Sequence, residues 1–215
     1  MTRLQEVQER ITAAARRAER ADRPVLIAVS KRHDAAAIRP LLEAGHRDFG
    51  ENRVEEAAEK WPALKADFPD VRLHMVGQLQ SKKTSDAMAL FDTIHSLDRA
   101  SLLKALVKQR DKGERCPDLF VQVDLGAEEQ KGGLGPAALD GFLRAVRGHS
   151  LPLVGLMCLP PQDKEASPYF ALLAELARRH GVDGLSMGMS ADLEEAVMLG
   201  ATHVRVGSAL FGERS

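Results

Sequence analysis

Aromatic residues are scarce in this sequence of 215 residues: one tryptophan, one tyrosine and seven phenylalanines make up 4% of it. Proteins that bind single-stranded nucleic acid stack the bases on aromatic side chains, and proteins that bind the phosphate backbone carry an excess of positive charge. Here 30 lysines and arginines are balanced by 31 aspartates and glutamates. The composition therefore argues against nucleic acid as a partner.

Long apolar runs are also missing, and none approaches the length of a membrane span. The amino terminus is too polar for a signal peptide, so we expect a cytoplasmic protein that does not bind a membrane. The only two cysteines, Cys116 and Cys158, are far apart and lack the spacing of metal ligands. We expect both to be reduced and at least partly buried, with no metal site; a disulfide between them is the alternative.

Strand-like runs alternate with helical patterns along the whole chain. Residues 1–22 come first and predict an amphipathic helix, because Leu4, Val7 and Ile11 recur at three-to-four spacing. Eight units of roughly 27 residues then predict an α/β fold: a single (β/α)8 TIM-type barrel with an extra amino-terminal helix, in one domain over residues 1–215. An open, doubly wound sheet is the alternative. The expected strands are 25–31, 48–52, 73–77, 93–97, 119–125, 153–158, 184–189 and 203–207.

The first expected strand is aliphatic and ends abruptly in a lysine, Lys31. In a barrel of this type the chemistry takes place at the carboxyl ends of the strands, so Lys31 is a candidate site residue. A lysine that merely marks where a strand meets water is the commoner case. The other expected strand ends are Asn52, Gly77, Ser96, Asp124, Cys158, Ser186 and Gly207-Ser208.

The last two strand ends suggest a phosphate ligand. Barrels frequently bind phosphate with the loops after strands seven and eight. Ser186 and Ser208 offer hydroxyl groups there, and Gly207 allows an oxygen to approach backbone N–H groups. The alternative is that Gly207 and Ser208 only turn the chain.

The last strand also carries an arginine between two valines. If Val204 and Val206 face the surrounding helices, Arg205 points into the barrel, where it needs an acceptor such as a structural carboxylate. A lysine, a phosphate pocket and an inward arginine together suggest pyridoxal phosphate, held as a Schiff base on Lys31. An arginine beside the ring nitrogen would disfavour protonation of the ring, which argues against aminotransferase chemistry.

Seven motifs, in this order, resemble the pyridoxal phosphate homeostasis protein family. The resemblance covers nearly the whole chain and implies a barrel similar to the amino-terminal domain of bacterial alanine racemase. It implies that Lys31 carries pyridoxal phosphate, that Asn52 lies near the ring, that Arg205 meets the ring nitrogen, and that Ser186, Gly207 and Ser208 hold the phosphate. The motifs are Leu26-Ile27-Ala28-Val29-Ser30-Lys31, Phe49-Gly50-Glu51-Asn52-Arg53-Val54, Ile94-His95-Ser96-Leu97-Asp98, Glu128-Glu129-Gln130-Lys131-Gly132-Gly133, Gly155-Leu156-Met157, Leu185-Ser186-Met187-Gly188-Met189-Ser190 and Val204-Arg205-Val206-Gly207-Ser208.

The chain departs from the family pattern in a few places. Leu73 stands where the family usually has a tryptophan, and Lys82 stands where it usually has an asparagine. Lys82, Lys83 and Lys131 suggest a second cofactor contact or a hand-over site, although solvated surface lysines are the simpler interpretation.

Four other residues have local interpretations. Glu51 is expected to be a charge at the start of a helix rather than a general base. Ser190 is expected to cap the helix after strand seven. His74 is expected to be a packed strand residue, and Asp124 to pair with one of those lysines or to face water.

Racemisation needs a base on each face of the substrate carbon. In the racemases that the barrel resembles, a second domain supplies a tyrosine, whereas the one tyrosine here, Tyr169, belongs to the helix after strand six or the loop before it. We therefore expect a monomeric binding protein that holds pyridoxal phosphate and hands it to apo-enzymes that need it. Its effect would be on amino-acid and keto-acid balance, with no catalytic residue assigned. The alternatives are a small racemase or lyase that uses the cofactor, and a phosphosugar-binding barrel enzyme in which Lys31 forms a Schiff base with its substrate.

Overall fold

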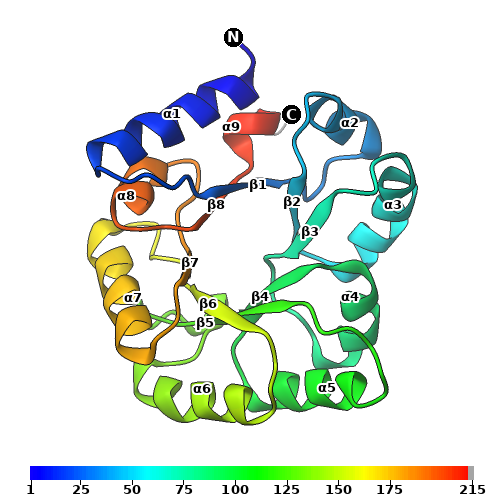
Figure 1. The fold of residues 1–215 in the computed structure, drawn as a ribbon, viewed down its shortest axis with the longest axis vertical. Coiled ribbons are helices and arrows are strands. Elements are labelled where there is room, and N and C mark those ends of the chain that lie inside the picture. Colours follow the sequence, from blue (N-terminus) through cyan, green and yellow to red (C-terminus); the bar gives the residue numbers. More distant parts are fainter. Residues whose placement is uncertain (213–215) are drawn as a thin grey trace.

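The computed structural model describes residues 1–212, and its centre is a closed barrel of eight parallel strands (Figure 1). Each strand pairs with the next along the chain, and β8 pairs with β1, so the open-sheet alternative is wrong. The strands are β1 Val25–Val29, β2 Asp48–Glu51, β3 Arg72–Met75, β4 Thr93–Leu97, β5 Asp118–Gln122, β6 Leu153–Met157, β7 Gly184–Ser186 and β8 His203–Val206.

Helices surround the strands on the outside of the barrel (Figure 1). Their apolar faces pack on the outer surface of the sheet, so the main core lies between strands and helices. The α-helices are α1 Arg3–Arg17, α2 Ala35–Glu43, α3 Val54–Asp67, α4 Thr84–Leu90, α5 Ala100–Arg110, α6 Leu139–Gly148, α7 Ser167–His180, α8 Leu193–Met198 and α9 Ser208–Phe211. Short 3₁₀ turns are η1 Ser81–Lys83, η2 Glu129–Lys131 and η3 Pro136–Ala138.

The extra amino-terminal helix is confirmed, although α1 spans residues 3–17 rather than the expected 1–22. Thr2 and Gln5 form a reciprocal capping box at its start. Its buried face includes Leu4, Val7 and Ile11, and it packs against α8 and α9 (Figure 1). The helix therefore covers the outside of the barrel beside the last strand.

Several strands are shorter than expected at their carboxyl ends. β3 ends at Met75 rather than at residue 77, and β7 ends at Ser186 rather than at residue 189. Hydrophobic patterning continues past these points because the loops also bury side chains such as Met187, which is fully buried. The residues between the expected and the observed ends form the loops in which the candidate site lies.

Two further expectations can be compared with the structure. Cys116 and Cys158 are both free thiols, as expected, and burial raises the pKa of Cys158 to about 12. Within residues 1–212, no helix combines the length and the apolar character that crossing a membrane requires.

Candidate functional site

Lys31 lies at the carboxyl end of β1, where the sequence places the chemistry. The strand before it is buried, and Lys31 itself is half-buried. Together with Arg32, Asn52, Arg53 and Glu56 it lines a cavity of about 120 Å³. The structure thus brings together two of the predicted site residues, Lys31 and Asn52, from the ends of neighbouring strands.

The turn that carries Lys31 is held in an unusual backbone conformation. Arg32 has a φ of 65°, in the left-handed region that residues with a side chain rarely adopt. Its backbone N–H donates a hydrogen bond to the Glu56 carboxylate. The ammonium group of Lys60 donates to the carbonyl oxygens of Ser30 and His33, each at 2.9 Å. Backbone strain of this kind persists only where the surroundings hold it, and it is common at functional sites.

Glu51 is part of this support, and its expected role as a helix-start charge is wrong. Its side chain is fully buried, and one carboxylate oxygen accepts from the Ser30 hydroxyl at 2.6 Å and from the Trp61 indole N–H at 3.0 Å. Lys60 lies 2.9 Å from the same oxygen. Alternation along β2 explains the placement: Glu51 shares the face of Phe49, which packs against Trp61 of α3.

Gly77 allows the loop after β3 to pass close to Asn52. A side chain at position 77 would place its Cβ 2.3 Å from the backbone oxygen of Asn52, which no real contact permits. A second cavity, of about 400 Å³, lies along this approach and shares Asn52 and Arg53 with the cavity of Lys31. Its remaining lining includes Met75 and Lys83.

Arg205 points into the barrel, as the alternation of β8 predicts, and only 5% of it is exposed. One terminal nitrogen donates to the Ser186 hydroxyl at 2.6 Å and the other donates to the Cys158 carbonyl oxygen at 3.0 Å. Burial lowers the pKa of the guanidinium from its usual value. The acceptors are a hydroxyl and a carbonyl rather than the structural carboxylate that the sequence suggested.

Ser208 lies at the rim beside a residue that sequence reasoning assigned to another role. Its hydroxyl donates to the Ser190 hydroxyl at 3.3 Å. Ser190 was expected to cap α8, but that helix begins at Leu193 after Asp192, three residues beyond Ser190. The motif of strand seven contains Ser190, but no local pattern reveals that its hydroxyl faces Ser208 instead of a helix end.

The turn that presents Ser190 is anchored from three sides. Arg10 of α1 donates to the Ser190 carbonyl oxygen at 3.1 Å and also pairs with Glu194. The backbone N–H of Met189 donates to Asp192 at 2.5 Å. Gly188 has a φ of 92°, and an added Cβ would lie 2.4 Å from Ala196, so the packing of α8 demands glycine there. The serine is thus held at the rim by the first helix and by contacts within its own turn.

The three lysines proposed as a second contact have separate environments. Lys82 is exposed, and Lys83 pairs with Glu55 at 3.1 Å. Lys131 is not a solvated surface lysine, because it is half-buried and bonds to Glu128 at 2.6 Å and to the Pro160 carbonyl at 3.0 Å. The structure therefore does not show them acting together.

Asp124 follows neither expectation. One of its carboxylate oxygens accepts from the backbone N–H groups of Gly126 and Glu128, at 3.1 and 3.2 Å. The carboxylate therefore organises the loop after β5 rather than pairing with a lysine, and it is half-buried rather than open to water.

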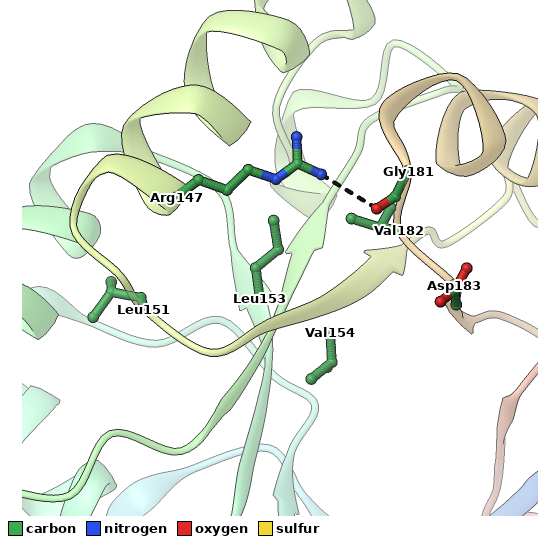
Figure 2. Close-up of a pocket in the computed structure, with 7 residues that line it drawn as sticks. All are labelled: Arg147, Leu151, Leu153, Val154, Gly181, Val182 and Asp183. Carbon is green, nitrogen blue, oxygen red and sulfur yellow. Dashed lines mark hydrogen bonds between the residues drawn. The ribbon is translucent and has the colours of Figure 1, made fainter.

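A cavity of about 480 Å³ lies at the opposite end of the barrel (Figure 2). Leu153 and Val154 at the start of β6 and Val182 and Asp183 before β7 line it, and Arg147 closes one side by donating to the Gly181 carbonyl at 3.4 Å. Because active sites of such barrels lie at the carboxyl ends of the strands, this cavity is not part of the candidate site.

Comparisons with known proteins identify the family of this chain. The family model described as "Alanine racemase, N-terminal domain" matches residues 2–215. The pyridoxal phosphate homeostasis protein of Pseudomonas aeruginosa is 41% identical over 98% of this chain and 94% of its own length. That of Aquifex aeolicus is 39% identical over 99% of this chain and 97% of its own.

A solved structure gives the same result in three dimensions. PipY of Synechococcus elongatus, solved with pyridoxal phosphate bound, is 40% identical and superimposes with a TM-score of 0.82, covering 96% of this chain and 100% of its own. The sequence matches extend over nearly the full length of both partners. The chain therefore belongs to the alanine racemase amino-terminal domain family and, within it, to the pyridoxal phosphate homeostasis proteins.

Proposed function

We propose that this protein binds pyridoxal phosphate as a Schiff base on Lys31 and maintains the intracellular level of the cofactor. The observation that carries the proposal is that Lys31 and Asn52 share one cavity at the carboxyl ends of β1 and β2. The bound cofactor in the related PipY structure supports it.

Lys31 at the end of β1, Arg205 inside the barrel and two serines after β7 and β8 suit the cofactor chemically. Pyridoxal phosphate supplies an aldehyde, which condenses with a primary amine such as that of Lys31. Arg205 supplies N–H donors from inside the barrel, which suits an unprotonated ring nitrogen. The hydroxyls of Ser190 and Ser208 lie together at the rim after strands seven and eight, where barrels bind phosphate.

Gly207 supports the phosphate assignment in a different way. Its φ is −113°, outside the region that favours glycine. An added Cβ would come no closer than 3.4 Å to another residue, an ordinary contact distance. Because neither the backbone nor the packing demands glycine here, a ligand that approaches the backbone accounts for it better than the fold does.

Holding the cofactor suits the site better than racemisation. The cavity of Lys31 is lined by two arginines, one asparagine and one glutamate besides the lysine. Glu56, the only carboxylate among them, already accepts from the Arg32 backbone and from Lys60 at 3.0 Å. A base poised on the opposite face of a substrate is therefore not provided by this lining.

The test is to add pyridoxal phosphate to the purified protein, record the visible absorbance, reduce with borohydride and map the adduct by mass spectrometry. We expect a yellow complex and an adduct on Lys31. Lys31→Ala should abolish both, while Lys104→Ala, on the exposed face of α5, should change neither. An adduct on another lysine would refute the assignment. Exchange of the α-proton of an amino acid in deuterated water would favour the racemase or lyase alternative.

Delivery is the second part of the proposal. A carrier is expected to transfer its cofactor to apo-enzymes that need it, which is measured as recovery of their activity when the loaded protein is the only source. Transfer no faster than from free cofactor at the same concentration would argue against a carrier role. The monomeric state, the cytoplasmic location and the effect on amino-acid and keto-acid balance stay predictions.

A further inference from the structure

Five polar side chains form a continuous hydrogen-bonded chain across the inside of the barrel. Arg205 of β8 donates to the Ser186 hydroxyl at 2.6 Å, and that hydroxyl lies 2.8 Å from Nδ1 of His95. Nε2 of His95 lies 3.1 Å from Nδ1 of His74. Nε2 of His74 lies 3.0 Å from the Asp48 carboxylate. The chain thus links the last strand of the barrel to β7, β4, β3 and β2.

The middle of this chain is sealed from solvent. Ser186, His74 and His95 are fully buried, and only the Asp48 end is partly accessible, with 24% of its side chain exposed. The His95 ring also stacks on Phe120 of β5, with 4.5 Å between ring centres and 5° between ring planes. The ring is therefore fixed in orientation as well as in position.

The chemistry of the two ends sets the direction of every hydrogen bond between them. An arginine can only donate, and an ionised carboxylate can only accept. Since Ser186 accepts from Arg205, its single proton goes to Nδ1 of His95. A neutral His95 then carries its proton on Nε2 and donates to His74, which likewise carries its proton on Nε2 and donates to Asp48.

We propose that this one-way chain holds Arg205 in place for the cofactor, with Ser186, His95 and His74 as positioning residues. The proposal rests on the proposed function in one respect, that Arg205 contacts the cofactor. Ser186 then acts behind the arginine rather than on the phosphate, because its only proton is already committed to His95 and a phosphate oxygen needs a donor.

The charges along the chain agree with this direction. Burial keeps the pKa of His95 well below its ordinary value, and the positive charge of Arg205 acts in the same direction, so His95 is neutral. Although burial opposes ionisation of Asp48, the hydrogen bond from His74 leaves the pKa of the carboxyl below its usual value. Within residues 1–212 no cluster of three or more potential ligands is arranged to hold a metal ion, so the histidines are not explained by metal binding.

Arg205 does not use all of its N–H donors in these bonds. Two of the five guanidinium N–H groups are used, one on Ser186 and one on the Cys158 carbonyl. Both fixed bonds run to the protein interior from different nitrogens, so the guanidinium plane cannot rotate. The remaining N–H groups can then donate to a ring nitrogen without any change of rotamer. Binding therefore costs less side-chain conformational entropy.

The direction of the chain can be tested without any cofactor. In the apoprotein at neutral pH, two-bond proton–nitrogen NMR spectra report which ring nitrogen of each histidine carries the proton. We expect the Nε2–H tautomer for both His74 and His95. An Nδ1–H tautomer at either residue would refute the proposal, whatever the protein binds.

The positioning role is tested with a matched pair of variants. His95→Phe keeps the ring and its stacking on Phe120 but removes the acceptor of Ser186. We expect its dissociation constant for pyridoxal phosphate to rise about tenfold and the visible absorbance maximum of the bound cofactor to shift. His203→Phe alters a histidine 5.8 Å from His95 that bonds to Thr202 instead of to the chain, and should leave both values unchanged.

A third variant separates positioning from folding. His95→Gln retains one acceptor and one donor at that position, so it should bind the cofactor more tightly than His95→Phe; equal loss in the two variants would overturn the proposal. Wild-type affinity and absorbance in His95→Phe would also overturn it. If the wild-type protein binds no pyridoxal phosphate, the proposed function fails, and the tautomers of the apoprotein still decide whether the chain exists.

Discussion

Ile27 of β1 and Arg205 of β8 are register partners in the pair of strands that closes the barrel. Val29, two residues later, is the last residue of β1, so Arg205 lies about 7 Å below that end of the strand at about 3.3 Å per residue, and Lys31 lies two residues beyond it. The lysine is at the rim and the arginine is deep in the barrel, on adjacent strands. If one ligand is held by both residues, as proposed above, we expect it to extend from the rim into the barrel.

Replacing the buried arginine tests the deep end of this arrangement. In the wild-type protein, Ser186 and Cys158 accept from two different nitrogens of Arg205. Arg205→Lys keeps the positive charge but has a single nitrogen, so it cannot reproduce both bonds. We expect pyridoxal phosphate to bind at least about tenfold more weakly, measured by absorbance titration. Because Lys31 is unchanged, borohydride should still fix the cofactor to it at saturating concentration. Unaltered affinity would show that the guanidinium geometry is irrelevant.

The two rim serines should matter for the phosphate alone. Ser190→Ala and Ser208→Ala each remove one hydroxyl of the pair, and each should weaken binding of pyridoxal phosphate about tenfold, as loss of a charged hydrogen bond does. Binding of pyridoxal, which has the same aldehyde and no phosphate, should not change. Equal losses for both ligands would place the serines elsewhere in the site.

Lys60, which holds the turn that carries Lys31, should contribute to the free energy of unfolding. Lys60→Met leaves the fully buried Glu51 carboxylate without its cation and releases the carbonyls of Ser30 and His33. We expect a loss of about 3 kcal/mol in the free energy of unfolding, measured by urea denaturation.

Lys83→Met is the matched control for that variant. It breaks the more exposed pair with Glu55, whose side chains are 32% and 58% exposed. The expected loss is much smaller than for Lys60→Met, because exposed ion pairs contribute little. Similar losses in the two variants would contradict the role given to Lys60.

Stability should fall in mild acid because of the interior histidines. Burial lowers the pKa of His203 to about 4 and also lowers that of His95. In the unfolded chain histidine titrates near about 6.5, so between about pH 6.5 and 4 the unfolded state binds more protons than the folded state. The free energy of unfolding is therefore expected to decrease as the pH is lowered through this window.

His203→Phe should make that decrease shallower. The variant lacks the proton that His203 binds in the unfolded state, so the slope of the free energy of unfolding against pH falls by at most about 1.4 kcal/mol per pH unit. Urea denaturation of both proteins from pH 8 to pH 4 provides the measurement. Parallel curves for the variant and the wild-type protein would mean that His203 keeps an ordinary pKa.

The sequence predicted the parts of this structure that depend on local periodicity. The β/α alternation indicated the barrel, and the flanking valines indicated that Arg205 points inward. It did not predict where strands end, because buried loop residues such as Met187 continue the apolar pattern. Glu51 was misassigned because its partners Lys60 and Trp61 lie nine and ten residues further along the chain, in a helix whose register against β2 the pattern does not specify.

The side-chain contacts across the barrel could not be predicted either, because local sequence patterns do not specify how the strands pair. Nothing local distinguishes a packed histidine from one that bonds to a partner on another strand, and His74 was rightly expected to be packed without its bonds being foreseen. Ser190 and Ser208 are 18 residues apart in sequence and meet only because β7 and β8 are neighbours. Such pairings are set by strand register and barrel closure, not by the spacing of residues.

The bonds of Arg10 have a consequence for the order of folding. Arg10 belongs to the first helix of the chain, yet it bonds to Ser190 and to Glu194, 180 and 184 residues later. On the ribosome, α8 and α9, against which the first helix packs, emerge only when nearly all of the chain has been made. Contacts of such long range slow folding, so we expect the rim that holds Ser190 to be the last part of the barrel to form, and the ability to capture a cofactor to appear only in the final folding step.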